Sequence, residues 1–139
     1  MAGQAAFGTT LKIGGTAGTA IVNITEINPP SQSAETLDMT AHDSGGAYRE
    51  MVPSFLSAGE VTLTINWDPN AATHKNAAGG LRKLFADRAS SSFAIAYPVT
   101  PVAHDIFTAY VTGFEPSAPF DDKLTARVTL TVAGAPTLA

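Results

Sequence analysis

The sequence contains no cysteine and few charged side chains. Without cysteine the chain cannot form a disulfide bond, a thiolate metal site or a thiol nucleophile. Charged residues make up 14% of its 139 residues, well below the quarter or so that is usual for a soluble globular protein. We therefore expect stability to come from packing, and we expect something other than water, such as another protein chain, to cover part of the surface.

Basic clusters and long apolar runs are also missing. Eight Lys and Arg residues stand against twelve Asp and Glu residues, which disfavours tight binding to a nucleic-acid backbone. No apolar run approaches the roughly 20 residues that span a bilayer, so no contact with a membrane is expected. The N-terminus lacks the basic and apolar regions of a secretory signal, which predicts residence in the cytoplasm after synthesis.

Two segments alternate apolar and polar residues, as half-buried antiparallel strands do. They span residues 60–68 and 123–132. The apolar positions of the first segment are Val61, Leu63, Ile65 and Trp67. Weaker strand patterns cover residues 11–13, 20–27, 35–39, 93–97 and 106–114. Turn-forming Gly, Pro, Asn and Asp residues separate these segments, which predicts hairpin connections.

One helix is predicted between the strands, because Ala77, Leu81, Leu84 and Phe85 recur at helical spacing. It should end near Arg88. Two adjacent glycines at positions 79 and 80 are unfavourable within a helix, so its first turn is expected to be loose or absent. Seven strands and one helix predict a mainly β protein, an antiparallel β-sandwich or barrel with one flanking α-helix, in a single domain over residues 1–139.

Residues 41–58 are predicted to form a long loop outside this sheet. A loop of this length with exposed apolar side chains is usually functional. It could fold back over its own core or dock on a neighbouring subunit, and the density of its apolar residues favours docking. The predicted contact residues are Asp43, Ser44, Gly45, Gly46, Tyr48, Arg49, Glu50, Met51, Phe55 and Leu56.

Catalytic and cofactor motifs are not found. His42-Asp43 and His104-Asp105 are isolated pairs without further ligands at fixed spacing. Ser44 cannot form a triad with its immediate neighbours, and the glycine-rich residues 14–18 fit no phosphate-binding fingerprint. We therefore expect no enzymatic activity, no metal and no cofactor.

Several segments, taken in order, resemble the major tail tube proteins of long-tailed, non-contractile bacteriophages. The segments are residues 38–50, Gly59-Glu60-Val61, Asp68-Pro69-Asn70, residues 110–116 and a closing strand that ends at residues 133–138. None of them is diagnostic alone, so the resemblance rests on their shared order over residues 20–138. It implies a tail-tube-like fold and a structural virion protein.

The resemblance also implies partners. Hexameric rings would stack into a hollow tail, through which double-stranded DNA passes during ejection without specific binding. Tail terminator, tail tip and tape measure proteins are expected partners, and the protein would move from the host cytoplasm into the virion tail. Residues 1–8 would form a flexible arm for stacking, and residues 41–58 would be the loop between subunits.

A threonine-rich strand face would suit the lumen of such a tube, because it is wet and carries few cations. The candidate lumen residues are Thr62, Thr64, Asn66, Thr125, Thr129 and Thr131. Threonine is also common on the solvent face of any strand, and composition does not decide between these interpretations.

Two alternative functions stay open at this stage. One is the inner tube protein of a contractile injection or type VI secretion system. The other is a monomeric β-sandwich that binds a carbohydrate or peptide through an exposed aromatic residue, such as Tyr48 or Trp67.

Overall fold

The computed structural model describes residues 7–42 and 45–139, and every strand pair in it is antiparallel. The elements, in chain order, are β1 (Thr10–Ile13), β2 (Thr19–Ala20), β3 (Ile24–Asn28), β4 (Ser33–Asp38), the 3-10 turn η1 (Gly45–Ala47), β5 (Met51–Ser57), β6 (Glu60–Asn66), α1 (Leu81–Asp87), β7 (Ser90–Tyr97), β8 (Ala103–Ser117) and β9 (Thr125–Thr137). The predicted mainly β fold with one helix is confirmed.

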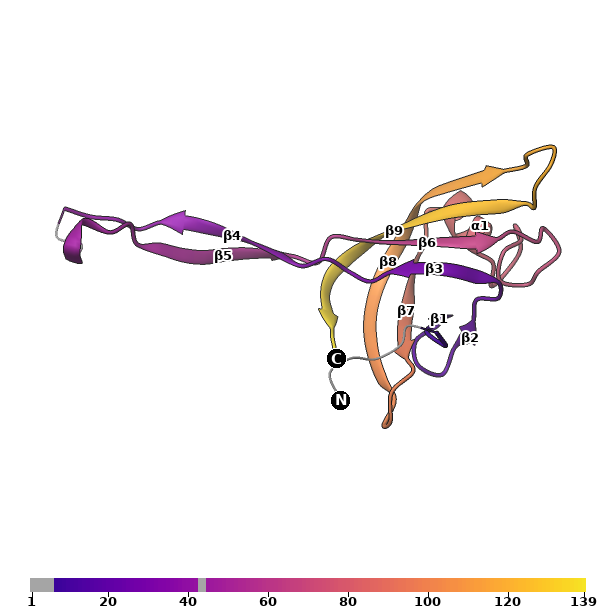
Figure 1. Ribbon diagram of the computed structural model, residues 1–139, viewed down its shortest axis with the longest axis horizontal. Helices are drawn as coiled ribbons and strands as arrows, with labels where there is room; N and C mark the ends of the chain where they lie inside the picture. The colour runs from indigo at the N-terminus through magenta and orange to yellow at the C-terminus, as the bar shows by residue number, and fades with distance from the viewer. Residues whose placement is uncertain (1–6, 43–44) are drawn as a thin grey trace.

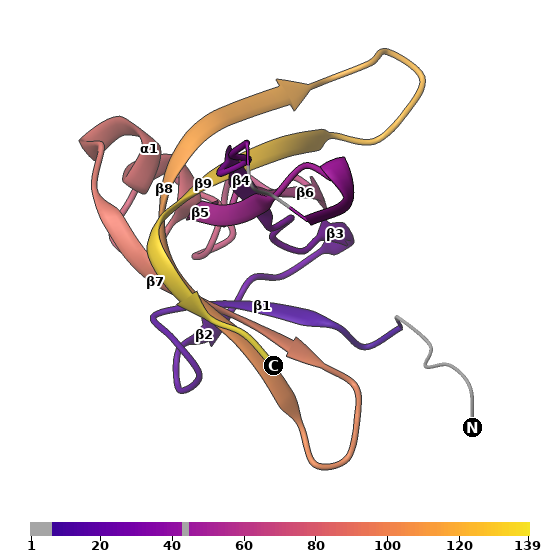
Figure 2. The same ribbon diagram turned by 90° about the vertical axis from the view of Figure 1, so that its left-hand side faces the viewer.

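Seven strands form one sheet in the order β2-β1-β7-β8-β9-β6-β3. The sheet curls into a half-barrel, which is clearest when the molecule is viewed along its long axis (Figure 2). The long strands β8 and β9 run through the middle, and a register shift between Val111 and Gly113 interrupts their pairing. Such bulges increase the local bend and twist of a strand. The curl gives the sheet an inner apolar face and an outer polar face.

The inner face of the sheet contains the core. The alternation predicted for residues 60–68 is confirmed at Val61, Leu63 and Ile65, which are at most 1% exposed. Further along the sheet, Phe93 of β7 and Phe107 of β8 stack with ring centroids 5.8 Å apart. Successive side chains of a strand point to opposite faces of the sheet, so the polar residues between the apolar ones in β6 face outward.

The largest difference from the sequence prediction lies in residues 41–58. The prediction of a loop was wrong for residues 51–57, because they form β5 and pair with β4 in a separate two-stranded sheet. Residues 35–39 therefore belong to this hairpin and not to the main sheet. The hairpin, residues 33–57, projects far from the body, and we call it the hairpin arm (Figure 1). Pro53 is tolerated in β5 because each strand of a two-stranded ribbon has a free edge.

A close crossing of the chain marks the root of the hairpin arm. Gly59 follows β5 and has a positive φ of 70°. A Cβ at this position would lie 2.5 Å from the carbonyl oxygen of Ser31, just before β4. Only glycine fits here without a shift of the backbone.

Helix α1 begins directly after the two glycines, so the expected absence of its first turn is confirmed. The helix packs beside β8. The guanidinium carbon of Arg82 lies 5.3 Å from the ring centroid of Trp67 and 5.5 Å from that of Phe114. The segment predicted as one strand over residues 20–27 is instead divided into β2 and β3, since Asn23 has a positive φ of 61°.

His74 is a fully buried polar residue that the sequence did not reveal as important. Its Nδ1 atom accepts a hydrogen bond from the backbone N–H of Asp68 at 3.2 Å. The other ring nitrogen, Nε2, lies 2.7 Å from the carbonyl oxygen of Val22 and must donate to it. The neutral ring thus joins the segment before β3 to the segment after β6.

Replacing His74 with leucine is expected to lower the free energy of unfolding by about 2–4 kcal/mol. Leucine retains an apolar side chain but leaves the N–H of Asp68 and the carbonyl of Val22 without this partner, and an unsatisfied buried group costs roughly 1–3 kcal/mol. Urea unfolding of the wild type and the variant measures the difference. His42→Leu, at an exposed position, is the matched control. Equal midpoints for both variants would contradict a bridging role of His74.

Candidate assembly surfaces

The His104–Asp105 pair does not form a catalytic arrangement. His104 and Asp105 are consecutive residues of β8, so their side chains point to opposite faces of the sheet. Asp105 is buried and accepts hydrogen bonds from the hydroxyl of Tyr97 at 2.5 Å and from the backbone N–H of Ala139 at 2.9 Å. Burial, and then the bond to Asp105, raise the pKa of the Tyr97 hydroxyl. Through these two hydrogen bonds, Asp105 joins β7 to the segment after β9. Asp43 lies outside the described residues.

The described residues 7–42 and 45–139 contain no group of three His, Cys, Asp or Glu side chains that could hold a metal ion. In the same part of the chain, no helix is long and apolar enough to cross a membrane. The surfaces that stand out are instead the hairpin arm, the outer face of the sheet and a groove at the sheet's open seam.

The hairpin arm is exposed along its two strands. All residues of β4 and all residues of β5 except Ser54 are exposed. Among the large apolar side chains, Tyr48 and Phe55 are both 78% exposed and Leu56 is 79% exposed. An isolated two-stranded hairpin is at best marginally stable in water, and apolar residues this dense require a cover.

Eight of the ten predicted contact residues lie on the described part of this arm. Gly45 and Gly46 lie in η1 at its far end, and Tyr48, Arg49 and Glu50 follow directly. Met51, Phe55 and Leu56 lie in β5. Asp43 and Ser44 lie outside the described residues, as do residues 1–6 of the predicted N-terminal arm.

Apolar side chains occupy both faces of the hairpin arm. Leu37 pairs directly with Val52, so these two share one face. The register pairs Met51 with Asp38 and Leu56 with Ala34, which places Met51 and Leu56 on the opposite face. An arm lying on the surface of a single partner would cover only one of these faces.

Hydrogen bonds fix the far end of the hairpin arm. The carboxylate of Asp38 accepts from the backbone N–H of Thr40 at 2.9 Å and from Arg49 Nη1 at 3.1 Å. Hydrogen bonds from Thr40, and to a lesser extent from Arg49, hold the pKa of Asp38 below its usual value. The N–H of Glu50 donates to the Thr40 hydroxyl at 2.8 Å. These hydrogen bonds join residues 38–40 to residues 49–50, across the two sides of the arm near its far end.

The outer face of β6 and β9 is lined with hydroxyl and amide side chains. Six residues predicted to face a lumen lie here, on the side opposite the core: Thr62, Thr64, Asn66, Thr125, Thr129 and Thr131. Thr62 pairs with Thr129, and the Thr131 hydroxyl lies 3.0 Å from that of Thr112 on β8. Arg127, paired with Thr64, is a cation on the same face.

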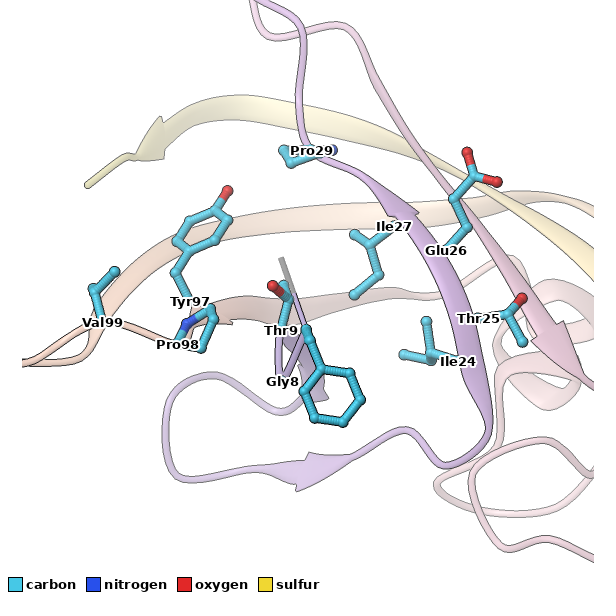
Figure 3. A pocket seen from close by; sticks show the side chains of 11 residues that line it. Gly8, Thr9, Ile24, Thr25, Glu26, Ile27, Pro29, Tyr97, Pro98 and Val99 are labelled. Atoms are coloured by element: carbon cyan, nitrogen blue, oxygen red, sulfur yellow. The ribbon is translucent and has the colours of Figure 1, made fainter. Parts of the chain in front are cut away.

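A groove of about 680 Å³ opens where the curled sheet fails to close. It lies between β3, at one end of the sheet, and residues 97–99 together with residues 7–9 before β1 (Figure 3). Ile24 and Ile27 are turned toward Tyr97, whereas Thr25 and Glu26 lie on the other side of β3 (Figure 3). We call this the seam groove. Sequence reasoning missed it because its walls are distant in the sequence.

Comparison with known proteins adds three kinds of finding. Residues 12–139 match a family model described as the lambda phage tail tube protein. A comparison with curated protein sequences finds no match.

Three solved structures are similar in fold. A chain from the virion of a native gene transfer agent has a TM-score of 0.79 and 18% identity, with 99% of each chain covered. A chain from the tail of an empty gene transfer agent particle, refined with C6 symmetry, has a TM-score of 0.70 and 20% identity, again with 99% of each chain covered. A chain from the sheath/tube terminator of an extracellular contractile injection system has a TM-score of 0.75 and 11% identity, covering 100% of this chain and 98% of the other.

Proposed function

The chain belongs to the lambda phage tail tube protein family, and from this premise we propose that six copies form a ring and that these rings stack into the hollow tube of a phage tail. The family match covers nearly the whole chain, so the protein is a structural tail tube protein. The observation that carries the finer proposal is the hairpin arm, which has apolar side chains on both faces and which no other part of the described residues covers.

Six-fold symmetry is supported by a solved relative in fold. The gene transfer agent tail that this chain resembles was refined with C6 symmetry. The body also has strands with free edges, since β3 pairs only with β6 in the seven-stranded sheet. Free edges favour pairing with a neighbouring chain, and head-to-tail contacts between copies close into rings or continue as filaments. A tube requires both kinds of contact.

The hairpin arm is the proposed contact between subunits. We assign this role to the predicted contact residues of the arm, above all to Tyr48, Phe55 and Leu56, because these side chains are large, apolar and about four-fifths exposed. Burying such a side chain contributes roughly 1.5–3 kcal/mol. Residues 1–8 are the proposed second contact, which would act in the stacking of rings.

Electron microscopy with light scattering tests the assembly directly. The protein should form hollow rings or striated tubes as its concentration rises, with a mass that is a multiple of six subunits. A protein that stays monomeric at every concentration, with or without nucleating tail tip protein, would contradict the proposal. A monomer that binds glycans would instead favour the ligand-binding alternative. Trp67 offers little to such a ligand, because it packs against the core beside Phe114.

A contractile injection or type VI system is the other alternative. Similarity to a contractile injection system terminator reflects a shared fold at 11% identity, whereas the family match is to the lambda phage tail tube protein. Sheath genes beside the coding gene would favour the contractile alternative, and their absence would favour the phage tail.

The outer face of β6 and β9 is the proposed lumen lining. The inner face of these strands is filled by the core, so only the outer face can meet solvent or DNA. Hydroxyl groups keep this face wet, and it offers few cations to hold phosphates, which suits a channel through which DNA must slide. On this proposal double-stranded DNA passes without specific binding. Tail terminator, tail tip and tape measure proteins complete the tail, and the subunit resides in the host cytoplasm before assembly.

A cysteine introduced as Thr129→Cys is expected to react with a small maleimide in assembled tubes but not with a maleimide carrying a large polymer. The reason is that a lumen admits small molecules and excludes the polymer, while the chain has no other cysteine to react. Gel shifts on monomers and on tubes measure both reactions. Asp121→Cys, in the exposed turn between β8 and β9, serves as the comparison. Protection from both reagents would place Thr129 in an interface, and reaction with both would place it outside the tube.

A further inference from the structure

We infer that the seam groove of one copy receives the far end of the hairpin arm of a second copy. The inference rests on the proposed tube and names the surface to which the arm binds. The far end of the arm comprises the paired ends of β4 and β5 and residues 45–50.

The seam groove lies at the edge of the core, where core side chains are only partly covered. Ile24, Ile27 and Tyr97 pack against the buried cluster but keep part of their surface exposed. In a closed barrel these side chains would be covered by the next strand, but here β3 has no strand beyond it. The groove therefore offers apolar side chains beside a free strand edge. A β-ribbon with apolar side chains fits both features, because its backbone can pair with the edge and its side chains can cover the apolar ones.

The far end of the hairpin arm has the matching chemistry. It carries Tyr48, and Met51 and Val52 on opposite faces, each about half or more exposed. A buried aromatic ring removes more apolar surface from water than an aliphatic side chain, and its hydroxyl can remain at the rim. Because the arm has two apolar faces, one face can cover the groove while the other meets a further neighbour.

The occupant must come from another copy. The arm leaves the body just after Pro29, which itself lines the groove, and then runs away from the body (Figure 1). Its far end lies at the opposite extreme of the long axis from most of the sheet, so it cannot return to the groove of its own chain without unfolding at the root. A second copy displaced along the arm can provide the groove.

Charge supports the same pairing. Glu26 is the only charged residue among the described residues that line the seam groove. Arg49, at the far end of the arm, keeps 81% of its side chain exposed although one nitrogen contacts Asp38. Because Glu26 lies on the other side of β3 from Ile24 and Ile27, the guanidinium of a docked arm would meet its carboxylate only across the free edge of β3, at the rim of the groove. Contacts at an interface rim contribute mainly to register and partner choice.

Cross-linking of two single-cysteine variants tests the inference. Met51→Cys is placed on the arm and Val99→Cys in the groove wall, and the two proteins are mixed, assembled and treated with a short bis-maleimide. Each product is identified by mass spectrometry. We expect a mixed dimer at a yield at least tenfold above that of Met51→Cys mixed with Ala78→Cys, which lies in the exposed loop before α1.

The outcomes separate this inference from the proposed function. Normal tubes with no excess of the Met51–Val99 product would overturn the groove as the docking site and leave the tube intact. Failure of the wild type to form rings or tubes at any concentration would overturn the proposed function and, with it, the inference. A strong Met51–Ala78 product in normal tubes would move the docking site to the loop beside α1.

Discussion

A double variant with Phe55→Asp and Leu56→Asp is expected to remain folded and to lose tube formation. Both side chains lie on β5 and are nearly four-fifths exposed in the isolated chain, so their replacement removes little that the monomer needs. In a tube they would be buried against a neighbour. Losing roughly 1.5–3 kcal/mol for each side chain, and burying a charge in its place, weakens each contact by about 3–6 kcal/mol or more.

That weakening has a large effect on assembly. Each 1.4 kcal/mol changes an association constant tenfold, so the concentration needed for tubes should rise by about a hundredfold to ten-thousandfold. Sedimentation and electron microscopy over a concentration series measure the threshold, and thermal unfolding shows whether the monomer is intact. The control adds the same two charges away from the arm, as Ala72→Asp with Ala78→Asp in the exposed loop before α1. Tubes at the wild-type threshold would show that these two arm residues are not a contact between subunits.

The sequence predicted the sheet best where the alternation of apolar and polar residues alone decided the structure. In residues 60–66 and 125–132 the apolar and polar residues alternate without a break, because one face meets the core and the other does not. The six outward Thr and Asn positions followed from the same alternation. The glycines at positions 79 and 80 also marked the start of α1 correctly.

The hairpin arm could be recognised from its residues but not from its secondary structure. Met51 to Ser57 includes a proline and has apolar residues on both faces, so no alternation is visible. This pattern is expected of a ribbon whose burial is decided by other chains, and a single sequence does not contain the partner's geometry. The apolar content predicted that the segment is a contact surface, whereas its pairing with β4 required the structure.

The seam groove and His74 were missed for a different reason. The groove joins β3 to residues 97–99, and the imidazole of His74 bridges Val22 and Asp68. Neither arrangement has a local pattern, because contacts between distant residues depend on how the whole sheet curls. Ile24 and Ile27 read as ordinary core residues, and only the unclosed edge of the sheet makes them accessible.

Replacing Phe93 with alanine is expected to lower the free energy of unfolding by about 3–5 kcal/mol. Phe93 is 0% exposed and stacks on Phe107 in the centre of the sheet, so its loss leaves a cavity lined by core residues. Most domains of this size are stable by only about 5–15 kcal/mol. Chemical denaturation measures the change. Phe120→Ala is the matched control, because Phe120 is fully exposed in the turn between β8 and β9. An equal effect of both substitutions would contradict the proposed core.

This variant should also assemble poorly, but at a different step from the arm variant. Only folded chains enter a tube, so assembly draws unfolded chains back to the folded state, and tubes should reappear as the concentration is raised or the temperature lowered. The aspartate variant of the arm is already folded, so conditions that favour folding, such as a lower temperature, should not restore its tubes. Measuring folded fraction and tube mass in parallel therefore distinguishes a defect in the sheet from a defect in the contact between copies. If the Phe93 variant were fully folded and still failed to assemble, its side chain would have to influence an interface from inside the core.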